Sequence, residues 1–311
     1  MEPILQIEHL SITFTQYSRG ARRRELPVIR DLSLSLSPGE VTAVVGASGS
    51  GKSLLAHAIL GLLPYNSRRK GSILYKGQEL TPRRLEKLRG REISLVPQGV
   101  TYLDPLMKVG PQLTQGRRDI DTRRRAREAL SRYGLGPETE RRYPFQLSGG
   151  MARRVLMASA VMESPQLIIA DEPTPGLDAQ AAGRLLGHFR ELAQEGAAVL
   201  FITHDLELAL TVAHRVAVFY AGETIEEALA SDFEVGSLRH PFTKALWDAL
   251  PQRGFRPIPG SQPYPGEVGE GCPFLGQCPH PGADCAQGPL PLRPFQGGAV
   301  RCLYPNKEVA P

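Results

Sequence analysis

The sequence GASGSGKS at residues 46–53 constrains the fold of this chain more than any other stretch. It follows an apolar run typical of a buried strand, residues 41–45, and precedes an apolar run of helical length, residues 54–63. A glycine loop in this position turns its N–H groups toward a phosphate, and the helix behind it adds a positive dipole end. An ordinary glycine turn would not need the lysine and serine as well. The stretch therefore predicts a nucleoside triphosphate and Mg²⁺ site made of Gly46, Ser48, Gly49, Ser50, Gly51, Lys52, Ser53 and Leu54.

The length of 311 residues fits one large domain, or one large and one small domain. No apolar run approaches the roughly 18 residues that a membrane span needs. The first residues also lack the basic and then apolar pattern of a secretion signal. We therefore expect a cytosolic protein whose membrane role, if it has one, is peripheral.

The net charge of +5 comes with clusters of basic residues. Such clusters can contact nucleic acid, attract an anionic membrane leaflet, or simply form solvated loops and helix faces. No aromatic residues interleave with them as a base-stacking groove requires, so no nucleic-acid partner is expected. The clusters are Arg22–Arg24, Arg68–Lys70, Arg117–Arg118 and Arg123–Arg125.

Apolar strands alternate with amphipathic helices along most of the chain, which predicts an α/β fold with a parallel sheet covered on both faces. A polar loop is expected over 16–26 and a helical insert over about 99–164. The expected strands are 4–14, 28–36, 41–45, 71–77, 92–98, 167–170, 198–203 and 215–220. The expected helices are 54–63, 122–133, 149–162, 179–194 and 205–213.

A second nucleotide element is expected where the strand at 167–170 ends in Asp171 and Glu172. Asp171 can hold Mg²⁺, and Glu172 can act as the general base for a water that attacks the γ-phosphate. Two acids at a helix start would be the structural alternative. Gln98 and His204 also follow strands, so they are candidate contacts for Mg²⁺, the attacking water and the γ-phosphate.

A further anion site is expected at the helix that begins after Ser148, because its first residues are Gly149 and Gly150. One chain would then carry two phosphate-binding surfaces. Two chains that meet head to tail could each close the nucleotide of the other, and Asp178 could bridge them.

These elements occur in the order found in ABC-type ATPases, which the chain resembles over residues 4–225. The resemblance implies a P-loop NTPase fold: a RecA-like core, an antiparallel β edge, a helical subdomain, and ATP held between two such domains. It also implies that Ser148 and Gly150 serve the partner's ATP, that Glu172 is the base, and that His204 senses the γ-phosphate. The family stacks adenine on an aromatic residue near the N-terminus, for which Phe14 and then Tyr17 are candidates.

The sequence after residue 238 reads RHPFTKAL at 239–246, with Pro251 next and GCPF at 271–274, and it is similar to the C-terminal extension of peptide and nickel importer ATPases. The resemblance implies an ABC ATPase domain over 1–238 and an extension over 239–311. It also implies a heterodimer with a related ATPase subunit, two membrane permeases, an extracytoplasmic binding protein, and a peripheral position on the cytoplasmic face of the inner membrane. The loop at 99–105 looks more like nickel and metallophore members, and Pro175 stands where Thr or Ser is common.

All four cysteines lie in this proline-rich extension, in the spacing C-x5-C-x6-C-x16-C. Structural disulfides are disfavoured in the cytosol, and paired C-x2-C zinc spacing is absent. Four thiolates suit a [4Fe–4S] cluster or Zn²⁺, and reduced thiols are the third possibility. The family resemblance favours the iron–sulfur cluster. The candidate ligands are Cys272, Cys278, Cys285 and Cys302.

The sequence thus predicts the ATPase subunit of an importer for a peptide, nickel or a metal–opine (metallophore) complex. The alternative is a soluble ABC-type ATPase that acts on ribosomes or DNA. Such proteins usually fuse two ATPase units or carry long coiled coils, and this chain has one unit and no heptad run.

Overall fold

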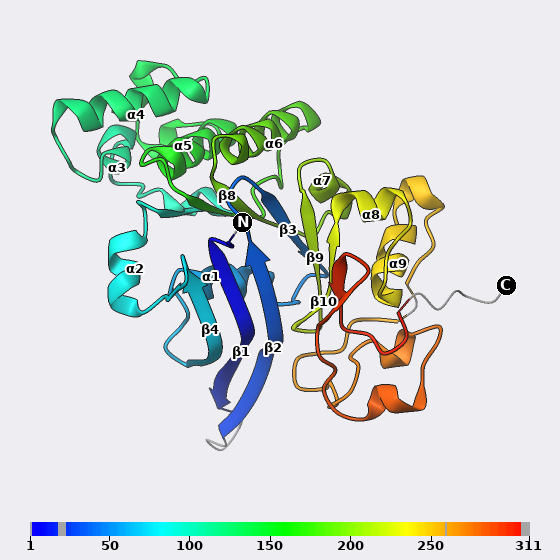
Figure 1. The fold of residues 1–311 in the computed structure, drawn as a ribbon. Helices are drawn as coiled ribbons and strands as arrows, with labels where there is room; N and C mark the ends of the chain where they lie inside the picture. The colour runs from blue at the N-terminus through cyan, green and yellow to red at the C-terminus, as the bar shows by residue number, and fades with distance from the viewer. Residues whose placement is uncertain (1, 18–22, 259, 306–311) are drawn as a thin grey trace.

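A mixed β-sheet organises the chain, with the strand order β5-β4-β1-β2-β10-β9-β3-β8-β7-β6 (Figure 1). The computed structural model describes residues 2–17, 23–258 and 260–305. Arg22 of the first basic cluster and the middle of the loop expected over 16–26 lie outside these ranges. The two ends of that loop are paired strand, Tyr17 with Arg23 and Gln16 with Arg24, so the loop prediction is wrong there. Polar residues are tolerated because this part of the ribbon is exposed to solvent on both faces.

Five parallel strands form the buried core of the sheet, and their C-terminal ends all lie on the same side of it. They are β3 (Val41–Gly46), β6 (Ile93–Val96), β7 (Leu167–Asp171), β8 (Ala198–Thr203) and β9 (Arg215–Tyr220). All contacts among them are parallel. Strands β3, β7 and β8 are buried at every position, which agrees with their continuous apolar sequences.

The antiparallel edge contains β1 (Leu5–Tyr17), β2 (Arg23–Leu36), β4 (Ser67–Tyr75) and β5 (Gln78–Glu79). Alternate residues of β1 and β2 are buried in a hydrophobic cluster shared with the first helix, α1 (Lys52–Ile59). This helix ends before residue 63, which was its expected limit. The chain belongs to the expected fold class, with an α/β core and an antiparallel β edge.

The helices α3 (Val109–Leu113), α4 (Ile120–Arg132) and α5 (Gly149–Val161) lie together at one end of the molecule (Figure 1). The other helices of the core are α2 (Pro82–Leu88), α6 (Ala179–Gln194) and α7 (Leu206–Leu210). Short 3₁₀ turns at Val100–Tyr102, Pro137–Arg141 and Pro144–Gln146 connect the helical part. No helix in the described ranges is both long enough and apolar enough to span a membrane.

The C-terminal part packs beside β9 and β10 (Glu223–Leu229) (Figure 1). It contains α8 (Ala230–Glu234), α9 (Pro241–Asp248) and the hairpin β11 (Arg293–Phe295) and β12 (Gly298–Val300). Turns at Pro251–Arg253, Leu275–Gln277 and Ala283–Ala286 are 3₁₀ helices.

Two features tie this proline-rich part to the sheet. Strand β12 pairs with the acidic strand β10. The next residue, Arg301, is 2% exposed, and its guanidinium donates to the Thr224 carbonyl at 2.9 Å and the Asp31 carboxylate at 2.9 Å. A segment with little apolar periodicity is thus held by strand pairing and a buried ion pair.

Candidate functional site

The glycine loop connects β3 to α1, as the sequence predicts. Gly51 has φ +97°, a left-handed conformation that strains other residues. Lys52 Nζ donates to the carbonyl oxygens of Gly46 and Ala47, each at 2.9 Å, which places its ammonium at the centre of the loop. Burial lowers the pKa of Lys52, while the nearby Glu172 and Asp171 carboxylates act in the opposite direction. The cation that a triphosphate requires is therefore held inside the loop.

Two oxygen donors converge beside this lysine. Ser53 Oγ donates to Asp171 Oδ1 at 3.1 Å, although the two residues are far apart in sequence. Burial raises the pKa of the Asp171 carboxyl, against the effect of the Ser53 hydrogen bond. A hydroxyl and a buried carboxylate in contact are a donor set that fits Mg²⁺.

Glu172 lies between the two other strand-end candidates. Its Oε2 accepts from Gln98 Nε2 at 3.1 Å, and its Oε1 lies 3.1 Å from His204 Nδ1. Its φ is +43°, and its backbone N–H donates to the Ile202 carbonyl at 2.9 Å. A non-glycine residue held in a left-handed conformation is often found at a functional site. The structure thus brings all three predicted catalytic residues into contact.

The predicted second phosphate surface is exposed. Ser148 caps α5, where its Oγ accepts from the Met151 N–H at 3.2 Å, and Gly149 and Gly150 follow on the surface. Asp178 caps α6 by accepting from the Ala181 N–H at 2.7 Å. Among the described residues, no hydrogen bond joins these two caps to Lys52 or Glu172, so each chain presents them outward.

The remaining nucleotide candidates occupy varied surroundings. Phe14 lies on β1 and packs, partly buried, against the hydrophobic cluster that β1 and β2 share with α1, whereas Tyr17 is 73% exposed. Ser48 is exposed, Ser50 is buried, and Leu54 of α1 packs against the same cluster.

The four cysteines line one cavity together with His240, Phe274 and His280. Burial raises the pKa of the Cys272 thiol to about 11, and the other three thiols add to that shift. No three His, Cys, Asp or Glu residues in the described ranges are arranged to hold a single metal ion. His240, to which the sequence patterns assign no role, is buried at the start of α9, and burial lowers its pKa to about 3.

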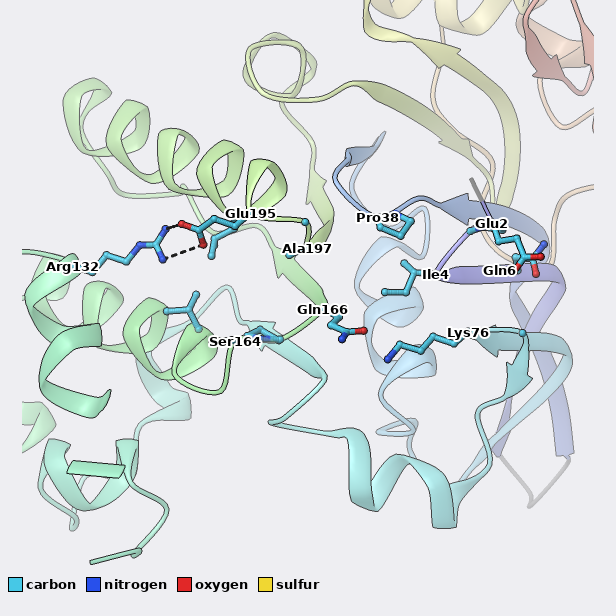
Figure 2. Close-up of a pocket in the computed structure, with 16 residues that line it drawn as sticks. Glu2, Ile4, Gln6, Pro38, Lys76, Arg132, Ser164, Gln166, Glu195 and Ala197 are labelled. Atoms are coloured by element: carbon cyan, nitrogen blue, oxygen red, sulfur yellow. Dashed lines mark hydrogen bonds and ion pairs between the residues drawn. The ribbon is translucent and has the colours of Figure 1, made fainter. Parts of the chain in front are cut away.

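A larger hollow lies at the N-terminal ends of the core strands, between the helical part and the antiparallel strands (Figure 2). Its lining includes Pro38, Gln166 and Ala197, which precede β3, β7 and β8. Arg132 of α4 pairs there with Glu195 at 2.8 Å. Because ligands of open α/β sheets bind at the C-terminal ends of the strands, this hollow is not the nucleotide site.

A smaller cavity at the C-terminal ends of the core strands contains two of the three predicted catalytic residues, Glu172 and His204. The loop residues Gly46, Ala47 and Ser48 line it together with Glu172 and His204. The C-terminal extension supplies further lining that no sequence pattern predicted to lie there: Phe242, Leu246, Ile258, Gly260, Gln262 and Gln277.

A strand–loop–helix phosphate site, an Asp–Glu strand end and an exposed capped helix together define a P-loop nucleotide-binding protein. Comparison with family models matches residues 29–175 to the ABC transporter family, and residues 225–285 to the oligopeptide/dipeptide transporter C-terminal region. The oligopeptide transport ATP-binding protein OppD of Escherichia coli is 35% identical, over 99% of this chain and 95% of the relative. The dipeptide transport ATP-binding protein DppD of Bacillus subtilis is also 35% identical, over 90% and 88%. The chain belongs to the ABC transporter ATP-binding family, in the branch with the oligopeptide/dipeptide C-terminal region, and it is an ATPase.

Solved structures agree with this fold. The ATP-binding cassette MJ0796, in a dimeric post-hydrolysis state bound to ADP and Pi, has a TM-score of 0.62 at 26% identity. The match covers 73% of this chain and 98% of the cassette. The protein cbiO1 of Clostridium perfringens, part of an ABC transporter complex, also has a TM-score of 0.62 at 26% identity, over 76% and 92%.

Proposed function

We propose that this chain is the ATP-hydrolysing subunit of a membrane importer. Glu172 acts as the general base: its carboxylate accepts the proton of a water that attacks the γ-phosphorus. Gln98 and His204 contact that carboxylate, and His204 is the proposed sensor of the γ-phosphate. The observation that carries this assignment is the position of Glu172 between both side chains, at 3.1 Å from each.

The phosphates bind to the loop N–H groups and Lys52. Ser53, Asp171 and Gln98 would hold Mg²⁺, which neutralises phosphate charge when it is bound. The converging Ser53 and Asp171 oxygens support this donor set. Phe14 is the proposed adenine contact.

Turnover requires two ATPase domains. Ser148, Gly149 and Gly150 are exposed on each chain, so they are free to bind the ATP of a second domain, with Asp178 beside them. The dimeric cassette MJ0796 supports this arrangement. We propose residues 1–238 as the ATPase domain, with a helical subdomain at about 99–164, and a related but different ATPase chain as the partner.

The names of the relatives support peptide import. An importer ATPase works at the cytoplasmic face of the membrane with two permease subunits and an extracytoplasmic binding protein. Tyr102, Leu106 and Met107 follow Gln98 and are 58%, 87% and 42% exposed, so they offer an apolar docking surface for permease helices. Nickel and metal–opine complexes remain a second cargo class because of the 99–105 loop, whereas ribosome or DNA binding is not favoured by the relatives.

The test is ATP turnover by the chain assembled with its permeases and binding protein. Turnover should rise when the binding protein carries a peptide, and it should stay basal with nickel or a nickel–opine complex. Stimulation by the metal forms alone would reverse the cargo assignment. Co-purification with ribosomes or DNA in place of permeases would refute the importer.

We also propose that residues 239–311 form a separate extension whose cysteines hold a [4Fe–4S] cluster. Four thiols on one cavity support this. A single Zn²⁺ would draw the sulfurs to about 2.3 Å from one point, whereas a cluster spaces them farther apart. The full chain purified without oxygen should contain iron and sulfide, and Cys285→Ser should lose both. Zinc or no metal in that protein would overturn the cluster.

A further inference from the structure

The catalytic cavity and the cysteine cavity share one partition. The 3₁₀ turn Leu275–Gln277 lies between Cys272 and Cys278 in the sequence. Phe274 and Leu275 line the cysteine cavity, whereas Gln277 lines the catalytic cavity. Neighbouring residues of one short segment therefore line the two cavities, with no residue common to both linings.

Gln277 is held by two hydrogen bonds of opposite sense. Its Oε1 accepts from the Tyr220 hydroxyl at 3.1 Å, and its Nε2 donates to the Ser261 carbonyl at 2.6 Å. The first bond anchors the turn to the end of core strand β9, and the second holds the segment that lines the catalytic cavity. The acceptor side of the amide thus joins the extension to the core, and the donor side joins two segments of the extension.

The segment 260–262 packs closely against the Gln277 amide at Gly260. Gly260 has φ +82°, and a Cβ there would lie 2.9 Å from Gln277 Nε2. Any other residue at position 260 would strain the backbone and displace the Gln277 amide.

The other side of the partition is an aromatic cluster. The Tyr220 ring lies 5.5 Å from the Phe274 ring and 4.4 Å from the Phe242 ring, and all three residues are almost fully buried. Close-packed interiors transmit displacements because they have no free volume to absorb them. A shift of the turn between Cys272 and Cys278 therefore moves Gln277.

We propose that Gln277 is a positioning residue for ATP hydrolysis. Through Tyr220 and the Ser261 carbonyl it holds residues 260–262 in the lining of the cavity that Glu172 and His204 also line. The positions of these two side chains, and with them turnover, therefore depend on the order of the cysteine-bearing turn. The proposal rests on the ATPase activity, and it is independent of what the cysteines hold.

Gln277→Leu keeps the volume and removes both hydrogen bonds. In the full chain assembled with its partner subunits, we expect kcat per bound ATP to fall about tenfold while the KM for ATP stays within about twofold. The control is Gln287→Leu, which changes an exposed glutamine of the same extension and should leave both constants unchanged.

Tyr220→Phe removes one hydroxyl and keeps the ring packing, so it decides the matter if Gln277→Leu does not fold. It should lower kcat by about threefold, and the double variant should be no slower than Gln277→Leu alone. Native kcat in Gln277→Leu, or in Tyr220→Phe where Gln277→Leu does not fold, would overturn the proposal, and so would a loss confined to KM.

Discussion

The Glu172 carboxylate receives contacts from Gln98 and His204, one at each oxygen, which leaves its remaining lone pairs for water. The residue proposed to activate the water is therefore different from the residues proposed to bind ATP. In the proposed site, Lys52 and the loop N–H groups bind the phosphates, and Glu172 takes no part in that binding.

Glu172→Gln should therefore retain ATP binding and lose hydrolysis by about 10²- to 10³-fold, since an amide cannot take up the proton of the attacking water. Equilibrium binding of labelled ATP and phosphate release give the two quantities. Unchanged phosphate release with intact binding would show that another group is the base.

His240 is buried and neutral, with a pKa lowered to about 3, and its Nδ1 caps α9 by accepting from the Phe242 N–H at 3.0 Å. The unfolded chain takes up this proton near pH 6.5 and the folded chain does not, so stability is full above pH 6.5 and falls below it. Between pH 7 and pH 5 the loss is about 2 kcal/mol from this residue.

His240→Asn keeps a cap acceptor and removes the titration, so its unfolding free energy should depend less on pH over that range. Urea unfolding followed by fluorescence of Trp247, the single tryptophan and a residue of α9, measures the difference. An equal pH slope in the variant and the native chain would contradict the assignment to His240.

At the scale of elements, the sequence predicted best what local periodicity decides. Helix 179–194 and strands 198–203 and 215–220 have the expected bounds. The contacts among Gln98, Glu172 and His204 were also predictable. Each of these residues follows a strand, and the C-terminal ends of parallel strands lie on the same side of the sheet.

Strand β10 escaped prediction because its sequence carries Glu223, Glu226 and Glu227, which are unusual in a buried strand. Only the folded chain supplies the partners: Glu226, 0% exposed, accepts from the backbone N–H groups of Arg239 and His240, each at 2.8 Å. The Tyr220–Gln277 contact was missed for the same reason, since residues that meet across a long sequence separation leave no local pattern.

The proposed permease-docking surface, made of Tyr102, Leu106 and Met107, belongs to one segment of the chain, and a charged substitution in it provides a test. Leu106→Glu should weaken assembly with the permeases and abolish transport, because it buries a carboxylate in an apolar contact, while ATP binding by the free chain stays unchanged. Ile120→Glu, at a residue 88% exposed on α4, is the matched control and should assemble normally. Normal transport by Leu106→Glu would place the permease contact elsewhere.

At the scale of the whole molecule, the exposed α5 N-terminus predicts that one chain is not sufficient for turnover. Ser148→Arg should keep ATP bound at the loop of its own chain, yet prevent ATP-dependent association and lower turnover at least 10²-fold, because a bulky cation replaces the cap that meets the partner's phosphate. Light scattering with ATP and a turnover assay measure both effects. Ser131→Arg, on the exposed part of α4, is the control. Full turnover by a monomeric Ser148→Arg chain would refute the shared site.

The pairing of β12 with β10 has a consequence for biosynthesis. Residues 298–300 leave the ribosome after every core strand, so until then β10 offers unsatisfied amide and carbonyl groups along Glu226 and Glu227 to any passing polypeptide. Nascent chains interrupted before residue 298 should therefore be the form most prone to aggregate. A chaperone that covers the unpaired side of β10 would matter most at the end of translation.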